Sequence, residues 1–278
     1  MDAMKNLSRT CSKAGKEGQP VIIPELRCKS TWSTRSKNSL EFCVALVLFV
    51  IALPSICLAT ILVKLTSRGP AFYFQSRSGR FGKRYVIYKL RTMYLDSERD
   101  TGPIWSSSSD ARITPLGRIL RRTHFDELPQ LWNVLRGEMS LVGPRPERPE
   151  FLPFLEEALP LYRMRLMLRP GLTGLAQVQL HADTDLASVR RKLAHDLYYV
   201  NASTAWLDVR VLLATALVVL GLSFPLVRSI LRLPRRKEIN RFYLRLTKRN
   251  STASNSEAGG AASRTKPTDD VIPSMGSA

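Results

Sequence analysis

An uncharged apolar run at residues 42–63 limits what this chain can fold into more than any other feature. About 20 apolar residues make a helix long enough to cross the hydrocarbon core of a bilayer. Pro54 interrupts the run and predicts a bend, because proline removes a backbone hydrogen bond. Lys37 precedes the run and Lys64 follows it, and positive residues favour the cytoplasmic side. The residues alone leave two topologies open: one crossing, or a helix that enters, bends and leaves by the same face.

The charge balance predicts acidic partners. The chain of 278 residues has a formal net charge of +19 and a pI near 10.3, which suits nucleic acid, anionic lipid or phosphorylated substrates. The cations are spread over the whole length and no zinc-finger or RNA-recognition spacing is present, so we expect no nucleic acid as partner. The four cysteines lack paired spacing and clustered histidines, which argues against a disulfide framework or a zinc site.

An adjacent acid pair, Asp126 and Glu127, marks the most informative stretch of the chain. Asp126 suits a helix N-cap, Glu127 suits the first turn, and Pro129 is tolerated there because its missing N–H would have no partner. Gly137 can end the helix in a left-handed turn. The pattern predicts a helix that begins at the acid pair.

Cations on both sides of this pair predict a phosphate site. A helix N-terminus favours an anion, and Arg121 and Arg145 would clamp a phosphate from two sides. In such a positive field both carboxylates can stay ionised, hold Mg²⁺ through oxygen, or supply a nucleophile that attacks phosphorus. An ordinary helix start with scattered surface arginines is the alternative.

Two strand candidates precede the acid pair, one around residues 71–75 and one at residues 85–93, joined by a turn that contains glycine. Alternate residues of a strand share a face, so Lys89 and Arg91 are expected to point the same way, toward phosphates. Two solvated cations on a strand face remain the alternative. Residues 96–112 are charged and serine-rich and predict a surface connection.

The second half of the chain alternates helical and extended patterns. Residues 150–168 and 184–200 have helical spacing, and residues 170–178 predict a turn that leads into a short extended piece. A second apolar run at residues 211–227 has basic flanks, which favours a helix lying in the membrane surface over a crossing. The three histidines have no motif around them, so we assign a structural role to His181 and His195 and no role to His124.

The ungapped stretch from Asp126 to Pro146, DELPQLWNVLRGEMSLVGPRP, resembles the signature of the bacterial sugar transferases, the monotopic phosphoglycosyl transferases. The resemblance implies transfer of a phosphosugar from a UDP-sugar to a polyprenyl phosphate, with release of UMP. It implies that Asp126 attacks the β-phosphate and that Glu127 helps to bind Mg²⁺. It also implies that Arg121 and Arg145 neutralise phosphate charge and that residues 42–63 form a re-entrant helix in one leaflet.

The chain departs from the family pattern around the membrane helix at Asn38, Glu41 and Leu53, where the family usually has Lys-Arg then Asp, and Ser-Pro at the bend. Leu175 stands where the family has Trp, in a region that lies near the donor, so we expect altered donor contacts.

The prediction is an α+β fold: a small, mostly helical catalytic domain with a short β-hairpin, a re-entrant membrane helix and interfacial amphipathic helices. Residues 1–34 are expected to be a disordered tail, 35–66 the membrane helix and 67–222 the catalytic domain; residues 223–249 form a basic membrane-surface segment and 250–278 a disordered tail. The expected location is the cytoplasmic face of the bacterial inner membrane, with the lipid bilayer as a partner. The competing functions are a basic membrane-anchored adaptor and a tethered nucleic-acid binder.

Overall fold

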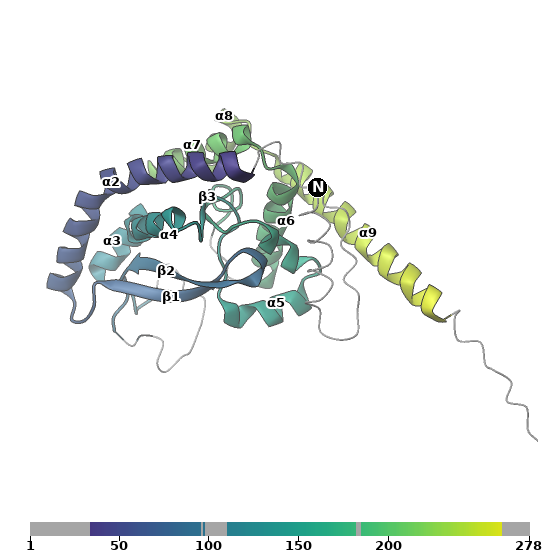
Figure 1. Cartoon of the computed structure of the whole chain (residues 1–278), viewed down its shortest axis with the longest axis horizontal. Helices are drawn as coiled ribbons and strands as arrows, with labels where there is room; N and C mark the ends of the chain where they lie inside the picture. The colour runs from purple at the N-terminus through teal and green to yellow at the C-terminus, as the bar shows by residue number, and fades with distance from the viewer. Residues whose placement is uncertain (1–33, 96, 98–109, 182–184, 263–278) are drawn as a thin grey trace, which may run out of the picture. The chain divides into compact units, whose positions relative to one another are not determined.

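The computed structural model describes residues 34–95, 97, 110–181 and 185–262 (Figure 1). By contacts the chain divides at Tyr243, so that residues 27–243 form one compact unit. The expected N-terminal tail and most of the serine-rich connection lie outside the described residues. The elements are α2 Thr34–Thr66, β1 Phe72–Ser78, η1 Arg80–Gly82, β2 Arg84–Leu90, α3 Pro115–Thr123, η2 Phe125–Gln130, α4 Leu131–Leu135, β3 Ser140–Val142, η3 Pro149–Phe151, α5 Leu152–Ala158, η4 Tyr162–Met167, β4 Gly171–Thr173, α6 Leu186–Ala202, α7 Ala205–Val219, α8 Phe224–Ile230 and α9 Arg236–Ala262, where η marks a 3₁₀ helix.

The apolar run forms one continuous helix, α2, that bends in its middle (Figure 1). Pro54 lies inside the helix, as expected, and accounts for the bend because it cannot donate to the helical ladder. Ser55 donates from Oγ to the carbonyl of Ala52 at 2.7 Å. A serine therefore makes a polar contact at the bend, although it follows the proline instead of preceding it. Residues 36–66 are long and apolar enough to cross a membrane.

Both arms of α2 pack against the same folded unit. The first arm buries Glu41 and Ala45, and Glu41 accepts a hydrogen bond from Ser140 Oγ at 2.5 Å. The second arm buries Ala59 and Val63 in an apolar cluster. That cluster comprises Ala59, Val63, Ala71, Leu90 and Leu120, with Phe72 and Leu116 packed against it. The bend lets one helix follow the domain surface along its whole length.

The hairpin forms as the sequence predicts. Strands β1 and β2 pair antiparallel, from Phe72 opposite Leu90 to Ser78 opposite Arg84. The second strand ends at Leu90, earlier than the expected limit of residue 93. Met93 instead makes an isolated bridge with Ile113, which joins the end of the hairpin to the segment before α3.

A second, parallel pair of strands was not foreseen. Strands β3 and β4 pair at Ser140–Gly171 and Val142–Thr173. The backbones come very close there, since a Cβ on Gly171 would lie 2.1 Å from the nitrogen of Gly143. Only glycine permits this approach. The extended piece expected after Pro170 is thus half of a miniature sheet that holds the loop after β3.

Three helical expectations change in detail. The helix expected at residues 150–168 is interrupted between α5 and η4, where Leu161 has φ +69°. The second apolar run is split into α7 and α8 by a turn at Gly221, which has φ +93°. The tail expected to be disordered from Asn250 is helical as far as Ala262, where the described residues end.

A buried polar network fastens the first arm of α2. Lys37 Nζ lies 2.9 Å from Asp208 Oδ2 and donates to the hydroxyl of Tyr199 at 3.1 Å, and that hydroxyl also hydrogen-bonds to Asp208. Arg169 donates to Asn38 Oδ1 at 3.2 Å. Asn38 and Glu41, the departures noted in the sequence, therefore make specific polar contacts of their own with the domain.

Candidate active site

The acid pair lies in η2, the short 3₁₀ helix between α3 and α4. Asp126 is not the N-cap that the sequence predicted; His124 takes this position with φ +58°, and Asp126 lies in the first turn. His124, in the left-handed conformation, is both the last cap of α3 and the first cap of η2. The second helix therefore follows the first directly and begins without a capping side chain. Gly137 has φ +72° after α4, as predicted.

The Glu127 carboxylate is held by two cations from other parts of the chain. Lys89 Nζ, from β2, donates to Glu127 Oε1 at 2.7 Å. Arg145 donates to the same oxygen from Nη2 at 2.7 Å and to Oε2 from Nη1 at 3.3 Å. Burial alone would raise the pKa of Glu127, but Arg145 and Lys89 outweigh it and hold this pKa well below its ordinary value. Glu127 is therefore ionised and fixed.

The Asp126 carboxylate has a different environment. Asp126 is buried, with 6% of its surface exposed, and no described residue donates a hydrogen bond to its carboxylate. Burial raises its pKa above the ordinary value, and the negative charge of Glu127 adds to this, whereas the charges of Lys89, Arg121 and Arg145 oppose it. One acid of the pair is thus engaged, and the other is left with oxygen atoms that can act on a ligand.

Arg121 stands on the Asp126 side of the site. Its Nε donates to Thr92 Oγ1 at 2.8 Å, which fixes the α3 side chain to the segment after β2. Burial lowers the pKa of the guanidinium, while the charge of Asp126 raises it. Arg121, Lys89 and Arg145 therefore form a positive field around the acid pair.

Arg91 does not join this group. Its guanidinium donates to the carbonyl oxygens of Arg68 and Ser67 at 2.7 and 2.9 Å, at the end of α2. The carbonyls at a helix C-terminus attract cations such as Arg91. Because β2 ends at Leu90, the strand alternation that points Lys89 into the site does not extend to Arg91. The structure brings together Lys89, Arg121, Asp126, Glu127 and Arg145. The Arg91 side chain is instead bound to the connection between α2 and β1.

The acid pair offers a limited set of ligands for Mg²⁺. Among the described residues no group of three or more His, Cys, Asp or Glu side chains is placed to hold a metal ion. Mg²⁺ commonly takes one or two carboxylates and completes its shell with substrate phosphates and water. The open Asp126 carboxylate fits that role, whereas Glu127 would have to share oxygens that Lys89 and Arg145 already occupy. The residues thus fit a cation that arrives with a phosphorylated ligand.

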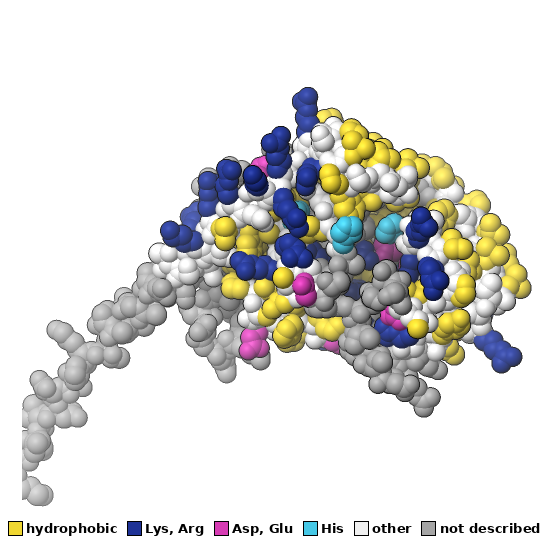
Figure 2. Space-filling view, turned by 180° about the vertical axis from the view of Figure 1, so that it is seen from behind, with side chains coloured by type: hydrophobic (Ala, Val, Ile, Leu, Met, Phe, Trp, Pro, Cys, Tyr) yellow, Lys and Arg dark blue, Asp and Glu magenta, His cyan; other side chains and the backbone are white. Residues whose placement is uncertain are grey.

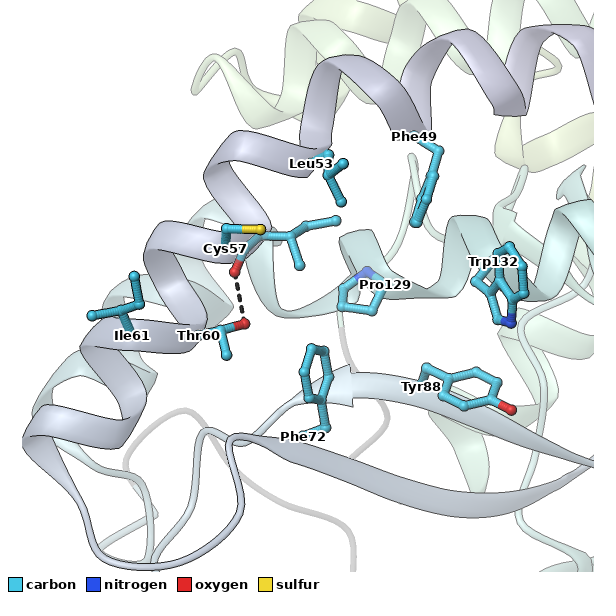
Figure 3. Close-up of a pocket in the computed structure, with 10 residues that line it drawn as sticks. Phe49, Leu53, Cys57, Thr60, Ile61, Phe72, Tyr88, Pro129 and Trp132 are labelled. Atoms are coloured by element: carbon cyan, nitrogen blue, oxygen red, sulfur yellow. Dashed lines mark hydrogen bonds between the residues drawn. The ribbon is translucent and has the colours of Figure 1, made fainter.

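An apolar pocket of about 500 Å³ lies between α2, the hairpin and the acid-bearing segment (Figure 3). Pro129, three residues after Asp126, faces it together with Trp132 from α4. Phe49 packs on Trp132 with ring centroids 6.0 Å apart. The lining residues are Phe49, Leu53, Ile56, Cys57, Thr60, Ile61, Phe72, Tyr88, Pro129 and Trp132. The polar site and the apolar pocket therefore share η2 as a common wall.

Hydrophobic side chains are exposed along α2. Figure 2 shows that hydrophobic side chains gather on one part of the molecular surface. Val47, Val50, Ile51 and Leu65 are each more than half exposed. An exposed apolar surface of this kind marks contact with lipid or with another protein. The outer side of α2 is thus suited to a bilayer, and its inner side contacts the domain.

Several residues near the site were not singled out from the sequence. Arg77 and Arg165 are bound to the loop that carries Arg145, and their only signal in the sequence is a position in a run rich in cations. Leu175 was expected to change donor contacts, but it is 1% exposed and lies in the core. His195 is buried with Nδ1 2.8 Å from the Arg191 carbonyl, and His181 lies against Phe224, in line with structural roles.

Comparison with known proteins identifies the family of the chain. The model of the bacterial sugar transferase family matches residues 32–221. The chain is 42% identical to a UDP-glucose:undecaprenyl-phosphate glucose-1-phosphate transferase of Caulobacter vibrioides, over 64% of this chain and 67% of that one. It is 36% identical to a UDP-N-acetylgalactosamine-undecaprenyl-phosphate N-acetylgalactosaminephosphotransferase of Aeromonas hydrophila, over 66% of this chain.

The match to the Aeromonas protein spans 43% of that relative's length. An undecaprenyl-phosphate glucose phosphotransferase of Komagataeibacter xylinus is 37% identical, over 70% of this chain and 38% of its own length. The residues matched by the family model include the acid pair and the bent helix. The family model covers more than half of the chain, and we conclude that the chain belongs to the bacterial sugar transferase family.

Proposed function

We propose that this protein transfers a phosphosugar from a UDP-sugar to a polyprenyl phosphate, undecaprenyl phosphate by preference, and releases UMP. The observation that carries the proposal is that the two carboxylates of the acid pair have different environments. Asp126 is buried in a positive field with no hydrogen bond from the described residues, while Glu127 is fixed by Lys89 and Arg145. The names of the relatives support undecaprenyl phosphate as the acceptor.

In the first half-reaction an Asp126 carboxylate oxygen attacks the β-phosphorus of the donor. The bond from this phosphorus to the bridging oxygen breaks, UMP leaves with the electron pair, and a phosphosugar-aspartyl intermediate forms, an acyl phosphate. Lys89, Arg121 and Arg145 offset the charge on the phosphoryl oxygens. Phosphoryl transfer depends mainly on positioning and on such charge stabilisation.

In the second half-reaction an oxygen of the polyprenyl phosphate attacks the same phosphorus. The bond to Asp126 breaks, the carboxylate is restored, and a polyprenyl diphosphate sugar is released. Bound Mg²⁺ would supply further neutralisation of phosphate charge, with Asp126 and Glu127 as the side chains available to hold it. Glu127, fixed as an anion, keeps Lys89 and Arg145 in place through both steps.

The apolar pocket supports a lipid acceptor. Its lining is hydrocarbon apart from the Thr60 and Cys57 side chains, the Tyr88 hydroxyl and the Trp132 indole nitrogen. The helix α2 with its exposed apolar face forms one side (Figure 3). A prenyl chain that enters from the bilayer along α2 would place its phosphate at η2. We therefore propose a monotopic enzyme at the cytoplasmic face of the bacterial inner membrane, at the first membrane step of polysaccharide or glycoconjugate assembly.

A membrane-anchored basic adaptor is the competing function, and it makes the opposite prediction for the acid pair. Charge-driven binding should weaken strongly with salt and tolerate changes at Asp126. The enzyme should lose UMP release in Asp126→Asn, an isosteric change that removes the nucleophile. Glu150→Gln is the matched control, since Glu150 is exposed and its one ion pair with a described residue is to Arg148 at 3.6 Å.

The decisive experiment is UMP release from a panel of UDP-sugars by the full chain in nanodiscs, with and without undecaprenyl phosphate and Mg²⁺. Protein quenched with donor alone should carry the sugar-phosphate mass on the peptide that contains Asp126. Normal turnover by folded D126N, or product formation without this adduct, would overturn the proposal. The panel also identifies the sugar, because each UDP-sugar is tested separately.

A further inference from the structure

The loop that carries Arg145 is tied at every carbonyl from residue 144 to residue 147. The oxygens of Pro144, Arg145, Pro146 and Glu147 accept, in that order, from Gly171 N at 2.9 Å, Arg165 Nη2 at 2.8 Å, Arg77 Nη1 at 3.3 Å and Ser78 N at 2.9 Å. Two of the four residues are prolines, which offer no N–H. The carbonyls are therefore the main backbone groups through which the rest of the fold can hold this loop.

Arg165 is the most deeply buried of the side chains that hold the loop. Its side chain is 2% exposed and lies 2.7 Å from Asp196 Oδ2, and Asp196 is 3% exposed. A second bond runs from Arg165 Nη1 to the Tyr162 hydroxyl at 2.7 Å. The guanidinium thus joins η4, α6 and the Arg145 carbonyl at one point.

We propose that Arg165, held by Asp196, is a positioning residue that aims the Arg145 guanidinium at Glu127 and at the donor phosphate. The proposal rests on the proposed function, because it gives Arg145 a task in phosphosugar transfer. Arg145 reaches Glu127 through two nitrogens at 2.7 and 3.3 Å, so its usefulness depends on direction as well as on charge. Displacement of a catalytic group by about 1 Å can lower a rate by about 10²-fold.

An ion pair with a purely structural role would not need the contact of Arg165 with the Arg145 carbonyl. Buried pairs can often be replaced by apolar side chains of similar volume without loss of stability. Here the guanidinium also donates to the backbone of the loop, and this requires several donors in a fixed plane. Lysine would keep the charge next to Asp196 but has no rigid fork with which to reach Tyr162 and Arg145 together. Arg165→Lys therefore keeps the positive charge at residue 165 but removes the directed hydrogen bonds that hold the Arg145 loop.

The test is a double-mutant cycle with the full chain in nanodiscs, read out as the rate of aspartyl adduct formation with a UDP-sugar. We expect Arg165→Lys to slow this step by about 10²-fold, mainly in kcat and with little change in donor KM. In the Arg145→Ala background the same change should alter the rate less than about 2-fold, because its target is gone. Asp196→Asn, which leaves Arg165 in place without its counter-charge, should act in the same direction as R165K.

Arg80→Gln is the matched control. Arg80 Nε donates to the Met167 carbonyl at 3.0 Å. Like R165K, this variant removes a hydrogen bond from a guanidinium to a backbone carbonyl, but the carbonyl belongs to η4 and the hydrogen bonds of the Arg145 loop remain. Its effect should be equal in both backgrounds. Additive effects of R165K and R145A, or normal kinetics in folded R165K and D196N, would overturn the positioning role. Absence of any adduct in the unmodified protein would instead overturn the proposed function, and a normal rate in R145A would remove the role of Arg145.

Discussion

Both ends of α2 should reach the same side of the membrane, and cysteine labelling can test this. Single cysteines at Ser36, Ile51 and Thr66, all exposed, would be placed in a chain whose native cysteines are replaced by serine. The expected result is that an impermeant maleimide labels Ser36→Cys and Thr66→Cys from the cytoplasmic side. Ile51→Cys, close to the bend at Pro54, should react from neither side.

The expected depth follows from the shorter arm of the helix. Residues 54–66, at about 1.5 Å per residue, reach about 20 Å, which is less than a hydrocarbon core of about 30 Å. The first arm is longer, but its half-buried Lys37 and its buried Glu41 and Ala45 contact the domain. A crossing would have to pull one arm away from these contacts, or from the cluster around Val63. The bend should therefore stay within about 20 Å of the cytoplasmic surface.

Right-side-out and inside-out vesicles give the two directions of access, and quenching of a fluorophore at residue 51 by lipids labelled at known depths gives the distance. Labelling of residues 36 and 66 from opposite sides would refute the reasoning. Such a result would mean that the contacts of one arm with the domain break in the membrane. Labelling at 51 from the far side would have the same meaning.

The limits of sequence reasoning are visible in particular residues. The hairpin could be predicted because alternation and a glycine turn are local signals. The pair β3–β4 could not, since three-residue strands have no readable period and Ser140 lies far in sequence from Gly171. Arg91 was misplaced because alternation was carried past the last strand residue, Leu90.

The unequal acids are a more instructive case. Adjacent carboxylates look alike in a sequence, and the signature resemblance alone gave them different roles. The difference arises from Lys89 and Arg145, which come from opposite sides of η2 in sequence and both bind Glu127. Arg165 escaped notice for a similar reason: a buried cation cannot be told from a surface one until its partner Asp196 is in place.

Three further variants test the energetics. Asp126 must be ionised to attack, and its raised pKa means that the rate falls as the pH drops through it; Lys89→Met removes the leading opposing charge and should move this acid limb of UMP release to higher pH. Leu175→Trp restores the family residue at a core position that is 1% exposed. The larger side chain should overpack the core, which lowers the free energy of unfolding by about 1–3 kcal/mol and lowers Tm by about 2–12 °C in thermal unfolding. Burial lowers the pKa of His195 to about 4, so the unfolded state takes up a proton at a higher pH than the folded state does. The free energy of unfolding therefore falls by about 3 kcal/mol as the pH drops from about 6.5 to about 4. His195→Phe should reduce the difference in the free energy of unfolding between about pH 7.5 and about pH 5.

The shared wall between site and pocket predicts that donor and acceptor steps can be separated. In a 3₁₀ helix residues three apart lie on the same side, about 6 Å along the axis, which relates Asp126 to Pro129. Trp132 continues the pocket wall and packs on Phe49 of α2. Trp132→Ala should therefore raise KM for undecaprenyl phosphate by about 10-fold or more, the scale of losing a buried aromatic contact of about 1.5 kcal/mol.

Adduct formation with donor alone should be unchanged in W132A, because among the described residues the Trp132 side chain makes no hydrogen bond with the carboxylates or their cations. A short, water-soluble prenyl phosphate is the control acceptor, since it gains less from the pocket and should lose less. Equal losses for long and short acceptors would show that Trp132 acts by holding α2 against the domain, and a slower adduct step would show that it shapes η2 itself.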